Sequence, residues 1–302
     1  SESDWYDYHS KKWANAQTED GSMWVWIPRY AYKVNETDKK FDIKFLIGTT
    51  DNYYDENGQI QTAKRCTNVN EEIDTKTGYT VHPAFTDETS IGYRNGGWDK
   101  ELTGIWVAKF EASNSSGKIK VVPGVSSWRS ITVNDIYTNC LNYNKTLNSH
   151  MMKNDEWGAV AYLSKSKYGK QNAEVDINSD SSYYTGGGSG NAYVTNVGQS
   201  TTGTVHGVYD MSGGAWEYVA AYVNNGNSNL TNYGSSLVNG DAKTKNVYSK
   251  ASTDNETNNY NANSSKYGDA VYETSANGNT SNGSWSVSYT HLRAHETLAN
   301  LV

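Results

Sequence analysis

Residues 207–218 read Gly-Val-Tyr-Asp-Met-Ser-Gly-Gly-Ala-Trp-Glu-Tyr, and the fold expected for this chain depends on this stretch more than on any other. Two acids, Asp210 and Glu217, stand on either side of the glycine pair at 213–214. A glycine pair favours a tight turn, because glycine adopts backbone angles that other residues avoid. The surrounding residues 171–285 are rich in Gly, Asn, Ser and Thr, a composition typical of loops. We therefore expect a buried turn and strand at 207–218, with loops wound over a small sheet around it.

Short strands and two helices are expected on the N-terminal side of this turn. Aromatic and β-branched residues predict strands at 23–34, 41–47, 104–110 and 119–122. Apolar residues spaced three and four apart predict an amphipathic helix that begins at Val133, after a capping box formed by Thr132 and Asp135. A second helix is expected from about 154 to 164, because acidic residues occupy its first turn and an apolar stripe follows them.

The core is expected to be built on aromatic side chains, which bury a large area each. The chain of 302 residues has 10 Trp and 24 Tyr, enough to supply such a core. The tryptophans on expected strands or helix faces are assigned to it: Trp24, Trp26, Trp106, Trp157 and Trp216. The tyrosines of 183–272 lie among Asn, Gly and Ser, which resembles the composition of antibody paratopes. A solvated loop surface is the alternative interpretation of that region.

Charge and composition exclude several classes of function. The net charge is −7, whereas binding nucleic-acid phosphate needs a basic patch, so no nucleic-acid partner is expected. The sequence contains no run of about 18 apolar residues, so no transmembrane segment is expected. The two cysteines, Cys66 and Cys140, lack the spacing of a zinc site, and we expect two free thiols. The chain begins at Ser1 rather than Met, which indicates a mature form or a fragment, and we expect it to be extracytoplasmic, at the cell surface or secreted.

Three segments in order, residues 106–113, 151–157 and 207–218, resemble the formylglycine-generating-enzyme or sulfatase-modifying-factor domain. Residues 207–218 are similar to that family's "GLYDMxGNVWEW", with Gly214 in place of the usual Asn. The resemblance implies an α+β, C-type-lectin-like domain with two helices, small antiparallel sheets and much irregular loop. We expect it to occupy residues 101–287.

Two further segments flank this domain. Residues 1–100 are expected to form a β-rich extension that packs on the core, since no Pro/Gly/Ser linker separates them from it. Residues 288–302 resemble the translated read-through of a sequencing adapter, and we expect a non-native tail there. For that reason His291 and His295 of the tail are not assigned to a metal site.

The resemblance covers an enzyme family, but the chain departs from it where the chemistry would occur. The family's catalytic cysteines follow an "RGGSW" strand near the C-terminus, whereas here only residues 282–285 echo that strand and no cysteine follows Cys140. The function implied is a non-catalytic surface or phage-associated protein that binds or displays an unknown protein or carbohydrate ligand. Two alternatives remain: a truncated oxidase of the formylglycine-generating type, and a structural surface component.

A calcium ion is the cofactor that the resemblance implies. In the related enzymes the turn matching 210–217 wraps Ca²⁺, which transfers to side-chain oxygens of Asp210 and Glu217 and to the carbonyls of Gly213 and Ala215. Carboxylate and carbonyl oxygens are the ligands that this hard cation prefers. The alternative is that Asp210 caps the turn and Glu217 pairs with a nearby Lys or Arg.

Overall fold

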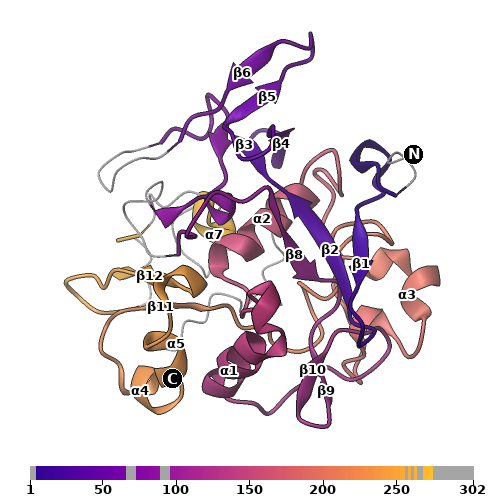
Figure 1. Ribbon diagram of the computed structural model, residues 1–302, viewed down its shortest axis with the longest axis vertical. Coiled ribbons are helices and arrows are strands. Elements are labelled where there is room, and N and C mark those ends of the chain that lie inside the picture. Colours follow the sequence, from indigo (N-terminus) through magenta and orange to yellow (C-terminus); the bar gives the residue numbers. More distant parts are fainter. Residues whose placement is uncertain are drawn as a thin grey trace.

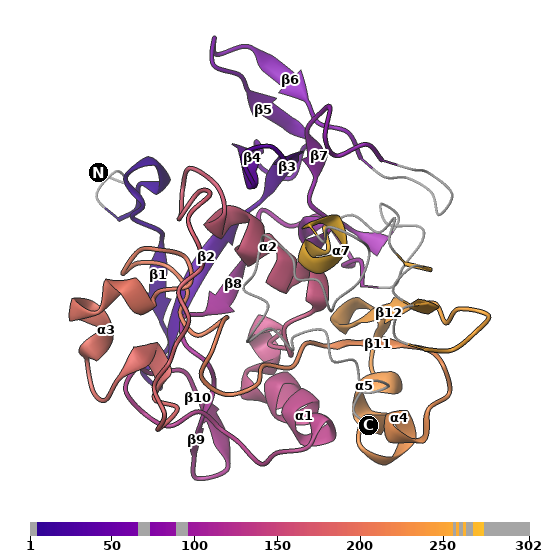
Figure 2. The ribbon, with the colours of Figure 1, turned by 180° about the vertical axis from the view of Figure 1, so that it is seen from behind.

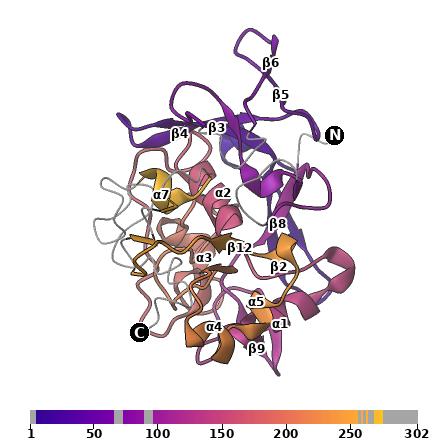
Figure 3. The same cartoon turned by 90° about the vertical axis from the view of Figure 1, so that its left-hand side faces the viewer.

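The computed structural model describes residues 5–65, 73–88, 96–255, 258–259, 262–263 and 268–274. Its architecture is α+β: small sheets and short helices connected by long irregular segments (Figure 1). A two-stranded hairpin projects at one end, and helices α1 (Val133–Tyr143) and α4 (Ser228–Asn232) lie at the opposite end in three views (Figures 1, 2 and 3). The predicted fold class is confirmed at this level.

The first sheet joins the N-terminal region to the middle of the chain. It has the order β1 (Asn15–Gln17), β2 (Met23–Pro28), β8 (Gly104–Ala108), with all pairs antiparallel. Side chains alternate across it as the pleat requires. Val25, paired with Val107, faces the core and is fully buried, whereas Trp26, paired with Trp106, lies on the other face.

The run 23–34 was expected to form one strand, and this expectation is wrong because the chain breaks at Arg29. β2 ends at Pro28, and Tyr30 begins β3 (Tyr30–Asn35) of a second antiparallel sheet. That sheet has the order β4 (Lys40–Phe45), β3, β7 (Thr80–Val81). Proline lacks the N–H that would continue the ladder.

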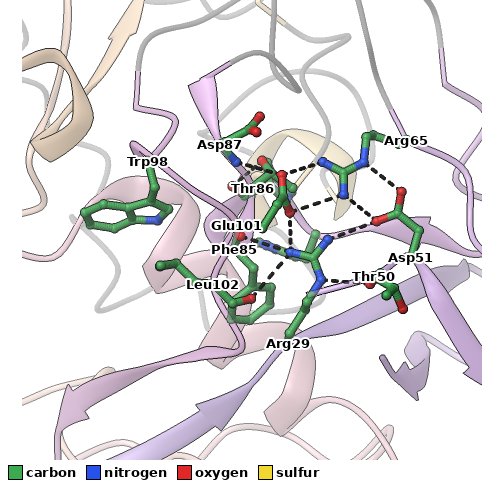
Figure 4. Close-up of polar contacts among 12 residues, drawn as sticks. Arg29, Thr50, Asp51, Arg65, Phe85, Thr86, Asp87, Trp98, Glu101 and Leu102 are labelled. Carbon is green, nitrogen blue, oxygen red and sulfur yellow. Dashed lines mark hydrogen bonds and ion pairs between the residues drawn. The ribbon is translucent and has the colours of Figure 1, made fainter. Parts of the chain in front are cut away.

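Arg29 is the centre of a charge network that attaches the projecting hairpin β5 (Asn52–Tyr54) and β6 (Ile60–Thr62) (Figure 4). Its buried guanidinium lies 2.9 Å from Asp51 and 2.6 Å from Glu101. Arg65 reaches the same two acids, at 2.8 Å through Nε to Asp51 and 2.6 Å through Nη1 to Glu101. Two cations and two anions thus neutralise each other at the base of the hairpin.

Both predicted helices are confirmed. Thr132 caps α1 by accepting a hydrogen bond from the Asp135 N–H at 3.2 Å. α2 (Asn154–Ser164) begins and ends where the sequence predicts, and every residue in it is buried. The Tyr30 hydroxyl donates to the Ala159 carbonyl at 2.7 Å, so this helix packs directly against β3.

One aromatic cluster unites residues on both sides of position 100. It contains Trp13 and Tyr30 from the first hundred residues together with Trp157 and Val219. Phe41 and Tyr162 stack in the same cluster, with ring centroids 3.7 Å apart. The N-terminal region therefore contributes to the core that also holds α2.

Residues 171–274 are mainly irregular, with a few short elements. β11 (Ala221–Val223) and β12 (Asn246–Tyr248) pair in parallel, so not every small sheet is antiparallel. The strand expected within 207–218 is absent; that stretch forms turns and isolated bridges at Tyr209 and Gly213. The other short elements are β9 (Ser113–Ser115), β10 (Lys118–Lys120), α3 (Ala192–Thr195), α5 (Ser235–Val238), α7 (Ala270–Thr274) and 3-10 helices at Tyr8–Ser10, Pro83–Phe85, Lys145–Leu147, Thr185–Gly187, Val197–Gln199 and Ala242–Thr244.

Several predictions concern residues outside the described ranges. Cys66, residues 282–285 and the tail 288–302 all lie there. Within the described part of the chain, no helix combines the length and the apolar character that crossing a membrane requires.

Candidate functional site

The turn at residues 210–217 depends on left-handed backbone conformations. Asp210 has φ 66°, Gly213 has φ 79° and Gly214 has φ 73°. A Cβ at position 213 would lie 2.3 Å from the carbonyl oxygen of Asn178, so this glycine also permits a close approach between two segments. The Asn178 N–H donates to the Ser212 carbonyl, and the Gly214 N–H donates to the Asn178 carbonyl, both at 2.8 Å. The turn is thereby held against residues near 178.

Asp210 is 2% exposed, and its carboxylate is surrounded by N–H donors. The Asn178 amide donates to Oδ1 at 2.9 Å, and the Gly186 N–H lies 3.0 Å from both oxygens. The Glu111 N–H donates to Oδ2 at 3.3 Å. In this arrangement Asp210 joins three segments and braces the turn from inside.

Gly186 belongs to the Gly-rich run at 186–190, which the sequence indicates only as a flexible loop. It lies instead in the 3-10 helix Thr185–Gly187, where Thr185 and Gly186 are buried. The left-handed φ of 73° at Gly186 turns its N–H toward Asp210. The run therefore contributes a backbone donor to the site.

Glu217 and Glu111 complete the cluster of acids. Trp157, buried in α2, donates its indole N–H to Oε2 of Glu217 at 2.9 Å. Glu111 follows β8, and its Oε2 accepts a hydrogen bond from the Ser127 hydroxyl at 2.6 Å. Both donors are neutral groups, so these contacts do not support the alternative that Glu217 pairs with Lys or Arg.

Burial raises the pKa of all three carboxyl groups, which we call the acid cluster. The pKa of Glu111 is raised to about 8, chiefly by burial and then by repulsion from Glu217 and Asp210. The pKa of Glu217 is raised to about 7 by burial and by repulsion from Asp210. The pKa of Asp210 is raised to about 6 by burial, against the hydrogen bonds that it accepts. The charges that shift these pKa values are carboxylates, so ionisation near neutral pH builds up uncompensated negative charge.

Charge repulsion couples the carboxyl groups of Asp210 and Glu217 and also involves Glu111, which the sequence analysis gave no role. Its signal was present, since Glu111 lies in the family-like segment 106–113. Ala215 also faces this acid, because its backbone N–H hydrogen-bonds the Glu111 carboxyl group. Within the residues that the structure describes, no three or more His, Cys, Asp or Glu side chains are grouped closely enough to hold a metal ion.

Three tryptophan assignments are wrong, because half-buried Trp26, like Trp106 and Trp216, belongs to no hydrophobic core cluster of the described residues. Trp216, expected in the core, is 58% exposed, and Trp106 is 43% exposed. Trp216 follows the left-handed residues of the turn, so strand alternation does not apply to it. Trp106 lies on the outer face of the β1-β2-β8 sheet, opposite the core.

Three other ionisable side chains, His150, His82 and Cys140, lie in structural surroundings. His150 forms an ion pair with Glu156 at 2.9 Å, and the His82 ring nitrogen Nδ1 caps the 3-10 helix at 83–85 by accepting the Ala84 N–H at 3.2 Å. Cys140 has a free thiol on the apolar face of α1, and burial raises its pKa to about 12. The pairing of Cys66 lies outside the described residues.

Comparison with known proteins adds no relative. No family model matches this chain, and no curated protein matches it. The functional conclusion therefore depends on the geometry of the site.

Proposed function

We propose that this chain is a non-catalytic, extracytoplasmic protein that binds or displays a ligand on a C-type-lectin-like scaffold, with one Ca²⁺ at the turn 210–217. One observation carries the proposal. The segments 106–113, 151–157 and 207–218 are far apart in sequence, and each supplies a group to the acid cluster or to its contacts.

Those contacts are specific. Segment 106–113 supplies Glu111, whose N–H bonds Asp210 of segment 207–218 at 3.3 Å. Segment 151–157 supplies Trp157, whose indole bonds Glu217 of segment 207–218 at 2.9 Å. If the three segments resembled the family only by chance, nothing would require them to lie together in the folded chain. Their convergence supports a shared scaffold with the family they resemble.

The donor set is suited to a hard cation, with one change from the predicted ligands. The oxygens of Asp210 already accept N–H donors, so Asp210 is better suited to bracing the turn than to binding a metal. Glu217 and Glu111, with the carbonyls of Gly213 and Ala215, would hold the ion. Calcium bound there would supply the positive charge that the acid cluster lacks.

The ligand surface that this arrangement supports lies beside the turn. Trp216, next to Glu217, exposes 58% of its surface. Tyr183, whose carbonyl accepts a hydrogen bond from the same Ser127 hydroxyl that bonds Glu111, carries the Arg129 guanidinium 4.0 Å from its ring centroid and has a left-handed φ of 58°. Non-glycine residues in such conformations cluster at binding sites, because strain is retained where it positions a contact.

The test is a thermal melt at pH 8 with millimolar Ca²⁺ or with chelator. Binding to the folded state alone stabilises by about 2.7 kcal/mol at a hundredfold excess over Kd, so the two melts should separate by several degrees. Glu217→Gln should abolish the separation. The matched control is Glu56→Gln, since Glu56 is an exposed acid on the hairpin (84% side-chain exposure) and should leave it unchanged.

Coincident melts of the wild-type protein would overturn the calcium site. Turnover of a sulfatase-motif cysteine peptide by the purified chain would overturn the non-catalytic assignment and favour the oxidase.

A further inference from the structure

The outer face of the β1-β2-β8 sheet carries a group of aromatic side chains that contribute little to the core. Trp5 is 55% exposed, Tyr6 is 44% exposed and Trp106 is 43% exposed. Trp106 lies 5.1 Å from the half-buried Trp26 and 6.5 Å from Trp5, and Trp5 lies 5.7 Å from Tyr6, all measured between ring centroids. We call these four residues the aromatic platform.

The rings of the platform are held in place by the fold. The Trp5 indole donates to the Asn15 carbonyl on β1 at 3.1 Å. Trp26 lies so close to Gly104 that a Cβ there would be 2.4 Å from its ring, so this indole rests directly on the backbone of β8. The opposite face of the sheet is filled by Val25 and its neighbours in the core. Fixed rings lose little conformational entropy when a ligand covers them.

We infer that the platform binds a neutral carbohydrate. Axial C–H groups of a pyranose ring carry partial positive charge, and the face of an indole is electron-rich, so the two surfaces are complementary. Interplanar angles of 36° for Trp5–Trp106 and 54° for Trp26–Trp106 show that the indoles are not stacked on each other. The indole faces therefore do not cover one another, and each can contact a separate sugar ring of an oligosaccharide.

The size of the platform favours a small ligand over a second protein. An aromatic side chain buries about 150–250 Å² when fully covered, so three rings about half exposed offer roughly 300 Å². A stable protein interface needs about 800 Å² from each partner. The platform is too small for that and comparable to the surface of a short oligosaccharide. The overall charge of −7 further disfavours acidic polymers.

This inference deepens the proposed ligand-binding role by naming a ligand class, and it uses residues outside the turn 210–217. The experiment is affinity electrophoresis through gels containing soluble xylan, mannan or β-glucan, combined with pull-down on insoluble cellulose and chitin. We expect retardation or capture by at least one of these. Trp106→Ala should weaken that binding about tenfold or more.

Two variants make the result interpretable. Trp106→Phe keeps a ring face and should retain most of the binding. Tyr54→Ala removes a ring that is 59% exposed on β5, and it should bind as the wild type does. Thermal melts check that each variant is folded, and the effect of calcium on the Trp106→Ala melt reports separately on the turn 210–217.

Failure of all five polysaccharides to bind would overturn the inference, even if the calcium effect persists. A concentration-dependent dimer that Trp106→Ala abolishes would overturn it in favour of self-association. If calcium has no effect on the melts but a polysaccharide still binds, the proposed metal site is overturned and the carbohydrate inference stands.

Discussion

The indole N–H of Trp157 donates to Oε2 of Glu217 at 2.9 Å, and this bond connects the interior of α2 to the turn at 210–217. Trp157 is 1% exposed, so the carboxylate is held beside an apolar helix. An indole satisfies one oxygen without neutralising the charge. The stability of the turn should therefore depend on protons and on cations.

The first prediction concerns pH in the presence of chelator. Glu111, Glu217 and Asp210 have raised pKa values of about 8, 7 and 6 in the folded chain, against ordinary values of 4.5, 4.5 and 3.8. The folded state therefore binds more protons than the unfolded state between these limits, and stability falls as the pH rises from about 4.5 to 8. Tm measured across this range should decline, and Glu111→Gln should flatten the decline. Equal slopes of Tm against pH for the wild type and Glu111→Gln would contradict a raised pKa of Glu111.

A second prediction tests the bond itself. Trp157→Phe leaves Glu217 without its indole donor and should cost about 1–3 kcal/mol of unfolding free energy. The loss should be larger at pH 8 than at pH 5, because only the ionised acid needs the donor. Trp24→Phe is the matched control, since its indole bonds the neutral Thr18 hydroxyl at 3.1 Å and should show no such pH dependence. Urea denaturation at both pH values measures the difference.

Asp210→Asn is the third prediction. Asparagine tolerates the left-handed conformation, so the backbone should not be strained by the change. Its amide group, however, places N–H donors against the donors from Gly186 and Asn178. We expect a loss of about 1–3 kcal/mol by urea denaturation. An unchanged midpoint would mean that Asp210 does not brace the turn.

The charge network at the hairpin gives the fourth prediction. Arg29→Met removes the buried cation that Asp51 and Glu101 share with Arg65 and should cost about 3–5 kcal/mol. Lys76→Met breaks an exposed pair with Glu36 at 2.9 Å and should cost less than about 1 kcal/mol. Similar losses for the two variants in chemical denaturation would show that the network contributes no more than a surface pair.

The fifth prediction concerns Cys140. Burial raises the pKa of its thiol to about 12, so little thiolate forms near neutral pH. In a Cys66→Ser variant, a thiol reagent should label the folded protein slowly and the unfolded protein at once. Rapid labelling of the folded variant would show that the face of α1 opens readily.

Local patterns predicted the helices well and the strands in part. α2 matches its predicted limits because its acidic first turn and its apolar stripe both lie within residues 154–164. The strand run 23–34 was overextended: Pro28, which cannot donate to a ladder, marks the break locally, but only the fold decides where the Arg29 side chain after it finds partners. Those partners, Asp51 and Glu101, are distant in sequence and give no local signal.

In the site, too, local sequence patterns indicated some residues, and contacts between distant segments supplied the others. The sequence alone indicated Asp210, Glu217 and the glycine pair between them, because a tight turn and its acids are adjacent in the chain. It missed Glu111 and the Gly186 N–H, which reach the turn only when segments about 100 and 24 residues away fold against it.

What the sequence by itself determined is two helices, an aromatic core and an acidic, Gly-rich turn, which follow from short-range periodicity, capping and backbone freedom, while the α+β class was what the family resemblance implied. Only the tertiary structure decided which aromatic residues are buried, since Trp157 is enclosed while Trp106 and Trp216 are exposed. It also decided that three acids share one buried environment. Burial and charge coupling arise from distant segments packing together, and no local pattern of residues encodes which segments those are.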